Sequence, residues 1–257
     1  MIRLFPVTIP FSLYNLADDP SCFGRGANPV YKDRFGAAIC NTESEGPSLE
    51  KNIMCYGDSN TYGESPEGKG RYPRSERWTG ILQERLGPGY HIIEEGLNGR
   101  TSVWEDPVEG DKCGYRQLSS ILASHTPLDL LIIMLGTNDL KHRFSATATD
   151  IALAMERMVK LAQSIDNYTA DKPFQILLVS PAEVCPKTFL GEVFGDRSGT
   201  TKEFPALYEA VAQRCGVWFL DIAQYAKPSQ LDGLHFDRDN HKKVAAAMEA
   251  KIHEILG

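Results

Sequence analysis

The chain has 257 residues, of which 42% are hydrophobic, 24% are charged and 9% are aromatic, which is typical of a folded globular protein of one or two domains. Its 34 acidic residues outnumber its 27 basic residues and give a formal charge of -7 without any basic stripe, so nucleic acids and anionic lipid surfaces are not expected as partners. The longest apolar runs are much shorter than the roughly 18 to 20 residues that cross a bilayer, so no membrane span is expected.

Residues 1–50 differ from the rest of the chain because they hold five of its 15 prolines and lack sustained periodicity. Proline fixes φ and removes a backbone donor, so no regular element can run through these positions. We expect residues 1–50 to form an irregular arm that wraps the folded domain or a neighbouring subunit. Residues 51–257 are expected to form a single domain.

From residue 51 onward, short runs rich in Ile, Val, Leu and Phe alternate with amphipathic stretches. The runs predict buried strands at residues 52–56, 90–94, 129–135, 174–180 and 217–221. The amphipathic stretches predict helices at residues 75–86, 114–125, 147–165, 201–215 and 239–256. Because a helix lies in every connection, consecutive strands are joined by crossovers. The sequence therefore predicts a three-layer α/β/α sandwich with a five-stranded parallel sheet.

Short polar motifs follow four of these runs. They are GDSN at 57–60, GLNG at 96–99, GTND at 136–139 and DGLH at 232–235. In an open parallel sheet the ligand site lies outside the carboxyl ends of the strands, so the motifs are expected to meet at one edge. A hydroxyl nucleophile, a base, a carboxylate that orients the base and donors for an oxyanion are the parts of an acyl-transfer site.

The spacing within these motifs indicates how the parts could work together. Asp232 lies three residues before His235, so its carboxylate can hold one ring nitrogen while the other nitrogen faces Ser59. The backbone N–H of Ser59 can also point at a bound carbonyl. The second residue after the serine is Thr61 and not glycine, which argues against the G-x-S-x-G elbow of an ordinary α/β-hydrolase.

The four motifs, in this order, resemble those of the SGNH (GDSL-type) hydrolase family, although Asn60 stands where the family's commoner form has leucine. The resemblance implies a flavodoxin-like SGNH hydrolase fold with Ser59 as nucleophile and Asp232 and His235 as the dyad. It also implies an oxyanion hole made by Ser59, Gly99 and Asn138, with Asn98 as an alternative to Gly99. The strings RWTG at 77–80, EEGL at 94–97 and DGLHF at 232–236 are similar to the arylesterase/acyltransferase branch of that family.

Members of this branch are serine esterases of small acyl esters that are often oligomeric, and some transfer acyl groups to alcohols. We therefore expect an esterase of short-chain acyl or aryl esters that works through an acyl-enzyme, needs no cofactor and forms a homo-oligomer. A carbohydrate deacetylase, a lysophospholipase-like hydrolase and a non-catalytic acyl- or carbohydrate-binding module are the alternatives. Aromatic side chains expected to build the substrate pocket, or else to pack a loop or a subunit contact, are Tyr62, Trp104, Phe189 and Phe194.

Other reactive residue types in the chain are assigned structural roles. The six cysteines are scattered without a CxxC pair, which favours a reduced protein with a cytoplasmic location, and Cys55 is expected in the core. Asp58 and Asp139 are expected to accept backbone N–H bonds that shape their loops. Histidines without metal-ligand spacing, for which we predict surface or capping roles and no metal, are His91, His125, His142, His241 and His253.

Overall fold

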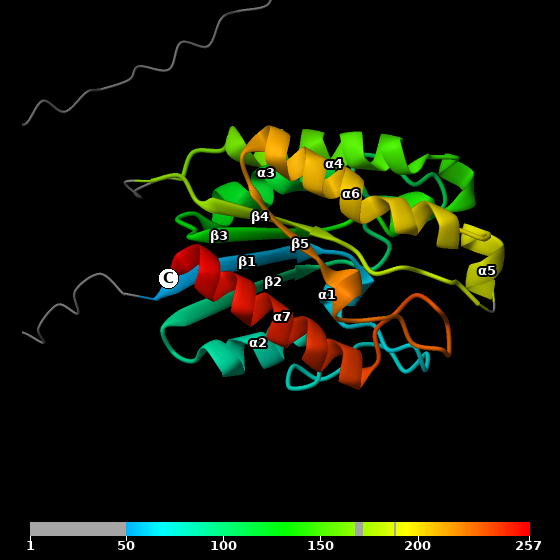
Figure 1. The fold of residues 1–257 in the computed structure, drawn as a ribbon, viewed down its shortest axis with the longest axis horizontal. Coiled ribbons are helices and arrows are strands. Elements are labelled where there is room, and N and C mark those ends of the chain that lie inside the picture. The colour runs from blue at the N-terminus through cyan, green and yellow to red at the C-terminus, as the bar shows by residue number, and fades with distance from the viewer. Residues whose placement is uncertain (1–49, 168–171, 188) are drawn as a thin grey trace, which may run out of the picture. The chain divides into compact units, whose positions relative to one another are not determined.

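The computed structural model describes residues 50–167, 172–187 and 189–257, so the predicted arm, apart from residue 50, lies outside the described residues. The strands are β1 (Lys51–Gly57), β2 (Tyr90–Gly96), β3 (Leu130–Met134), β4 (Gln175–Ser180) and β5 (Trp218–Asp221). They form one sheet in the order β2-β1-β3-β4-β5, and every neighbouring pair is parallel (Figure 1). The predicted five-stranded parallel sheet is confirmed.

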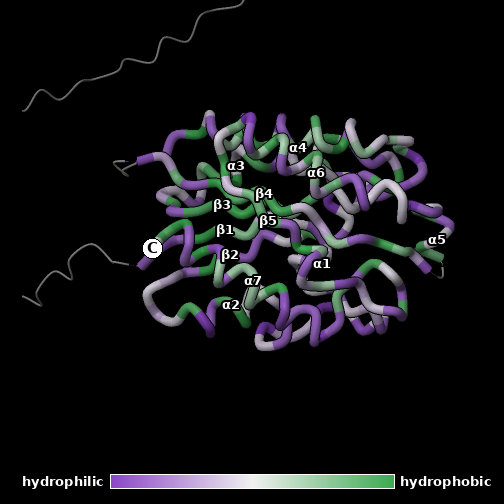
Figure 2. Tube along the Cα trace, in the orientation of Figure 1, coloured by the Kyte–Doolittle hydropathy of each residue, from purple (hydrophilic) through white to green (hydrophobic). Residues whose placement is uncertain are grey.

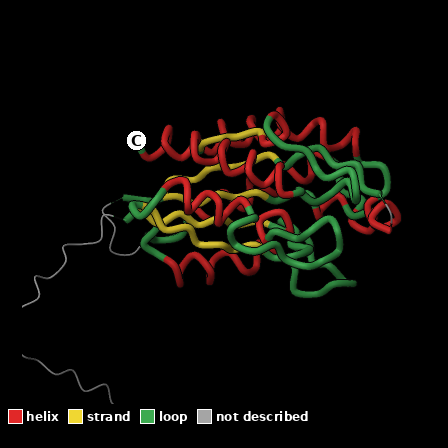
Figure 3. The backbone as a smooth tube through the Cα atoms, turned by 90° about the horizontal axis from the view of Figure 1, so that it is seen from below, coloured by secondary structure: helices red, strands yellow, loops and turns green. Residues whose placement is uncertain are grey.

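Helices cover both faces of this sheet. The helices of the described residues are α1 (Ser59–Tyr62), α2 (Trp78–Leu86), α3 (Gly114–His125), α4 (Ala148–Gln163), α5 (Phe189–Phe194), α6 (Ser198–Cys215) and α7 (Arg238–Leu256), of which α1 and α5 lie beyond the ends of the strands. The pair α2 and α7 lies on one face, whereas α3, α4 and α6 lie on the other (Figures 1 and 3). The predicted three-layer arrangement is therefore confirmed. No helix in the described part of the chain combines the length and the apolarity that crossing a bilayer requires.

The middle of the sheet is apolar on both faces because β3 is hydrophobic at all five of its positions rather than alternating (Figure 2). Successive side chains of a strand point to opposite faces. In β1, Met54 and Tyr56 join the core cluster that contains residues of α3, α4 and α6. Ile53 and Cys55 join the second cluster, which contains residues of α2 and α7. Burial of Cys55 in that cluster confirms its predicted core position.

Two predicted helices start three residues away from the expected position. The helix α2 begins at Trp78 and not at residue 75, because the N–H groups of Glu76 and Arg77 bond to the carbonyl of Pro73 and form a turn. The helix α6 begins at Ser198 and not at residue 201, where the Asp196 side chain accepts the Ser198 N–H. The helices α1 and α5 were not predicted, because four and six residues are too few to show helical periodicity.

The strand register brings the polar motifs to a common edge. Gly57 at the end of β1 lies opposite Gly96 of β2 and Met134 of β3. The segments that follow these three strands therefore leave the sheet side by side. A side chain at position 96 would be impossible without rearrangement, because a Cβ there would lie 2.2 Å from the backbone nitrogen of Tyr62. Glycine at this position lets α1 pack directly onto the end of β2.

Candidate active site

The serine predicted to be the nucleophile stands at the first turn after β1. Asp58 caps the short helix α1 by accepting the N–H of Asn60 at 3.0 Å, as the sequence analysis expects. Ser59 is the first residue of that helix and is largely buried. The burial of Asp58 raises the pKa of its carboxyl to about 6. The turn therefore presents the Ser59 hydroxyl and N–H at the carboxyl edge of the sheet.

The structure brings Ser59, His235 and Asp232 into one hydrogen-bonded chain. The distance from His235 Nδ1 to Asp232 Oδ2 is 2.7 Å, and that from His235 Nε2 to Ser59 Oγ is 3.0 Å. Because the carboxylate accepts from Nδ1, we assign the ring proton to Nδ1, which leaves Nε2 free to accept the proton of the serine hydroxyl. Ser59 and His235 are 176 positions apart in sequence and meet only because the chain folds, whereas Asp232 and His235 share one loop.

The Asp232 carboxylate is held in place by the backbone of its own loop. Its Oδ1 atom accepts the N–H groups of Leu234 at 2.9 Å and His235 at 3.0 Å. Burial works to raise the pKa of Asp232, but the hydrogen bonds from His235 and Leu234 outweigh it and keep the pKa below its ordinary value. The group is therefore ionised at neutral pH and can stabilise a positively charged imidazole.

Asn60 ties the histidine loop to the serine helix. Its side-chain amide donates to the carbonyl of Leu234 at 3.2 Å, and its side-chain oxygen accepts the N–H of Phe236 at 2.9 Å. The two bonds lie on either side of His235 and are buried. This role of Asn60 was not predicted; the one signal for it in the sequence is a polar residue where the family's commoner form has leucine.

The loop after β2 presents the second predicted oxyanion donor. Arg100 N–H bonds to the carbonyl of Leu97 at 3.1 Å and closes a four-residue turn. Gly99, the third residue of this turn, has a φ of 77°, a left-handed conformation that favours glycine. The Asn98 amide donates to Glu64 at 2.8 Å, whereas the Gly99 N–H donates to none of the described residues. The Gly99 N–H therefore remains available to a ligand.

The third predicted donor, Asn138, begins the 3-10 helix η2 (Asn138–Leu140), which follows β3 after a three-residue connection. Its amide nitrogen lies 3.1 Å from the carbonyl oxygen of Arg100, to which it donates one hydrogen. The amide has a second hydrogen, which can be offered to a ligand. Asp139 accepts the Ser102 N–H at 2.9 Å, as expected, and burial raises the pKa of its carboxyl to about 6.

Arg100 anchors the same loop from the inner side. Its guanidinium donates to the carbonyls of Gly57, at 2.9 Å, and Glu95, and it lies 4.1 Å from the centre of the Tyr56 ring. The side chain is buried, and this burial lowers its pKa. The loop that carries Gly99 is thereby attached to the ends of β1 and β2.

The four aromatic residues predicted for the substrate pocket lie in different environments. Tyr62 ends α1, with the Arg71 guanidinium 4.3 Å from its ring centre, and the Trp104 ring centre lies 6.4 Å from that of Phe144. Phe189 is 69% exposed, whereas Phe194 is buried in the core. No hydrogen bond or ring contact in the described structure joins any of the four to Ser59. Their assignment to the pocket stays a prediction.

His241 is not a surface residue, which corrects the expected surface or capping role in part. Its ring is fully buried, and its Nδ1 atom accepts the N–H of Trp78 at the start of α2. Burial lowers the pKa of His241 to about 4, so it is neutral at physiological pH. Among the described residues, no group of three or more His, Cys, Asp or Glu side chains is placed to hold a metal ion.

Comparisons with known proteins identify a matching family and similar folds. The profile of the GDSL-like Lipase/Acylhydrolase family matches residues 55–249. The aryl esterase of M. smegmatis is 35% identical, with 80% of this chain and 99% of that one covered and a TM-score of 0.76. A carbohydrate acetylesterase family member from Sinorhizobium meliloti is 34% identical, with 80% and 99% covered and a TM-score of 0.77. No curated protein matches the sequence of this chain.

Proposed function

Since the chain belongs to the GDSL-like lipase/acylhydrolase family and is a serine esterase, we propose that it hydrolyses short-chain acyl or aryl esters through an acyl-enzyme on Ser59. The observation that carries the assignment of the nucleophile is the hydrogen-bonded chain from Asp232 through His235 to Ser59, with distances of 2.7 and 3.0 Å. The arrangement matches the geometric roles of nucleophile, base and orienting carboxylate.

The proposed reaction follows from these positions. His235 Nε2 takes the Ser59 proton while Oγ bonds to the ester carbonyl carbon, and the carbonyl oxygen becomes an oxyanion. The N–H groups of Ser59 and Gly99 and the side-chain amide of Asn138 donate to this oxyanion. His235 then gives its proton to the leaving alcohol as the carbon–oxygen bond breaks. Water, activated by the same histidine, attacks the acyl-enzyme and releases the carboxylic acid.

Acyl transfer belongs to the same proposal, because an alcohol can replace water in the second half-reaction. Deacetylation of a carbohydrate is the second candidate, and it is supported by the similarity to the S. meliloti acetylesterase family member. Nitrophenyl esters from acetyl to long acyl, acetylated sugars and a competing alcohol separate these activities. Fast turnover of acetylated sugars alone would favour the second candidate.

The assembly and location are further parts of the proposal. We expect a homo-oligomer in the cytoplasm without a nucleic-acid partner, with the domain boundary near residue 50. The formal charge of -7 supports the expected absence of a nucleic-acid partner, and the dispersed cysteines support the cytoplasmic location. Light scattering of the full chain measures the assembly, and a monomer at all concentrations would contradict the oligomer.

The decisive test replaces the nucleophile. Ser59→Ala is expected to lower kcat by about 10⁴- to 10⁶-fold, because the acyl-enzyme can no longer form. Asn138→Ala is expected to lower kcat by about 10²- to 10³-fold, because one oxyanion donor is lost. Ser124→Ala is the control, because this exposed serine lies on α3 and, among the described residues, bonds only to its own helix and to the neighbouring His125. Full activity of Ser59→Ala would refute the assignment, as would labelling by a phosphonate at another serine.

A further inference from the structure

A lysine three residues after Asn138 is buried among acidic groups. The side chain of Lys141 is only 3% exposed, and the Asp106 side chain that faces it is 0% exposed. The Lys141 ammonium lies 3.0 Å from Asp106 Oδ2 and also contacts Glu109. A charge that is buried to this degree requires a partner, so the pair constrains where both of its elements can lie.

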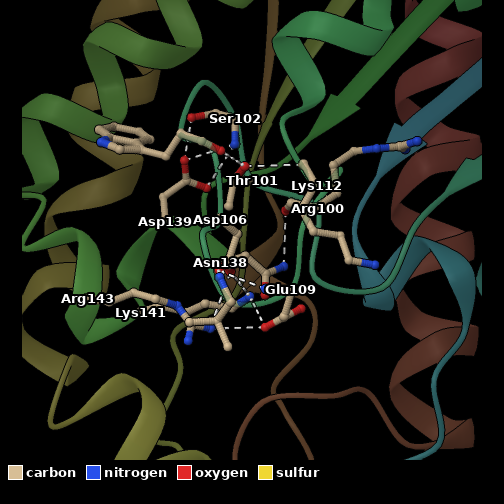
Figure 4. A network of polar contacts seen from close by, with 12 residues as sticks. Arg100, Thr101, Ser102, Asp106, Glu109, Lys112, Asn138, Asp139, Lys141 and Arg143 are labelled. Atoms are coloured by element: carbon tan, nitrogen blue, oxygen red, sulfur yellow. Dashed lines mark hydrogen bonds and ion pairs between the residues drawn. The ribbon is translucent and has the colours of Figure 1, made fainter.

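Arg143 completes the cluster, which we call the clamp and define as Asp106, Glu109, Lys141 and Arg143. The Arg143 guanidinium lies 3.1 Å from Glu109 Oε1 and 3.3 Å from Asp106 Oδ2. Two acidic and two basic groups give the clamp a formal charge of zero. Figure 4 shows the side chains of Lys141 and Arg143 directed at Glu109, so two residues near η2 hold one residue of the loop after β2.

Glu109 touches the backbone of the predicted oxyanion donor. A Cβ added to Gly99 would lie 2.3 Å from Glu109 Oε2, so the carboxylate packs against the Cα atom of Gly99. Asp106 shapes the chain that leads to Glu109, because its Oδ1 atom accepts the N–H groups of Val108 at 3.0 Å and Glu109 at 3.2 Å. The clamp therefore packs, through Glu109, against one side of the turn that carries Gly99.

The same stretch of chain also bonds directly to this loop. The Asn138 amide donates to the Arg100 carbonyl, and Asp139 accepts the Ser102 N–H. Lys141 adds the third connection, to Asp106 and Glu109 (Figure 4). Residues 138–141, which include the donor Asn138, thus bond at three places to the loop after β2, which carries the donor Gly99.

We propose that Lys141 is a positioning residue for the oxyanion hole and that, through Glu109, it fixes the Gly99 N–H relative to the Asn138 amide. This inference rests on the proposed function, in which both groups donate to the oxyanion. A donor displaced by about 1 Å loses much of its effect on the transition state, whereas substrate binding in the ground state depends less on it. Loss of Lys141 should therefore act on kcat more than on KM.

The test compares Lys141→Met with the unaltered full chain on two substrates, a nitrophenyl ester and its thionoester, in which sulfur replaces the carbonyl oxygen. Sulfur is a weak hydrogen-bond acceptor, so the thionoester depends little on the oxyanion donors. We expect kcat for the ester to fall by about 10- to 100-fold with a smaller fall for the thionoester, which lowers the ester-to-thionoester ratio by about fivefold or more. A mere loss of folded protein lowers both rates equally, and an unchanged ratio overturns the proposal.

A second variant addresses the buried charge that Lys141→Met leaves behind. Lys141→Met combined with Asp106→Asn removes the buried pair and keeps Glu109 opposite Arg143, so the remaining clamp is still neutral. We expect the double variant to show the same lowered ratio, because the connection from Lys141 to Glu109 is still absent. A ratio restored to that of the unaltered chain would mean that charge balance alone matters, and would overturn the positioning role.

The controls separate this inference from the proposed function. Lys160→Met removes an exposed lysine on α4 that is paired with Glu156 at 2.6 Å. The ester-to-thionoester ratio of this variant is expected to equal that of the unaltered chain. An equal change in that variant would overturn the specific role of Lys141. Ser59→Ala is measured in parallel: if it retains activity, the proposed function itself is wrong. If Ser59→Ala is inactive and the Lys141→Met ratio is unchanged, only the positioning role is wrong.

Discussion

Asn60 connects the helix of the nucleophile to the loop of the histidine through two buried hydrogen bonds. Asn60→Leu would leave the Leu234 carbonyl and the Phe236 N–H without these partners. We expect this variant to lose about 1–3 kcal/mol of unfolding free energy. We also expect kcat to fall by about tenfold with little change in KM, because His235 is held less firmly against Ser59.

Denaturant unfolding and steady-state kinetics check this prediction. Gln163→Leu is the matched control. Gln163, the last residue of α4, is exposed and donates to the carbonyl of Cys215, the last residue of α6. A variant at Asn60 with unchanged kcat would show that the loop holds His235 without help from α1.

The raised pKa of Asp58 predicts a pH-dependent stability. Its folded pKa of about 6 lies above the ordinary value of 3.8, so the folded state binds a proton that the unfolded state releases in this range. The stability that comes from this proton is present below about pH 4 and is lost as the pH rises through about 6, by about 3 kcal/mol for this group.

Asp58→Asn should remove this dependence, because the amide does not titrate and its oxygen can still accept the Asn60 N–H. The free energies of unfolding of the variant and the unaltered chain, measured from pH 4 to pH 7, should therefore diverge in favour of the variant as the pH rises. Parallel curves for the two proteins would contradict the predicted shift.

The helix α6 supports the turn that carries Asn138. Tyr208 of this helix is fully buried and donates its hydroxyl to the Leu135 carbonyl at 2.9 Å. Tyr208→Phe would leave that buried carbonyl without this donor. We therefore expect the free energy of unfolding to fall by about 1–3 kcal/mol. Denaturant titration measures this loss. Tyr115→Phe on α3 is the control, because the Tyr115 ring packs against Arg157 and its hydroxyl has no hydrogen bond to the described residues. An equal loss of unfolding free energy in this variant would contradict the role of Tyr208.

The element boundaries show where periodicity is a good guide. The helix α3 has the predicted bounds, 114–125, because its apolar side chains recur along one face and a proline follows two residues after its end. The predicted start of α2 is three residues early because residues 73–77 form a turn whose composition does not distinguish it from a helix. Short elements such as α1 depend on capping and on the space left by Gly96, neither of which is periodic.

For the molecule as a whole, every proposed catalytic residue lies between residues 50 and 257. We therefore expect a chain that lacks residues 1–45 to keep the esterase kcat per active site. If the arm binds a neighbouring subunit, as the sequence analysis expects, light scattering should show a smaller assembly after the deletion. An unchanged assembly would make the arm a passive extension, and an inactive protein would show that it contributes to the catalytic domain.

The period of apolar residues and the short motifs at strand ends were enough to predict the sheet, its two helical layers and the esterase family. The motifs also indicated Ser59, Asp232 and His235. The tertiary structure then showed that these three side chains lie within hydrogen-bonding distance of one another in a chain. Only the tertiary structure revealed the bonds of Asn60 across the site and the clamp around Lys141. In sequence, the partners in these interactions are separated by 174, 176 and 35 positions. No local pattern encodes such a pairing, because it arises only when separate loops meet at the edge of a folded sheet.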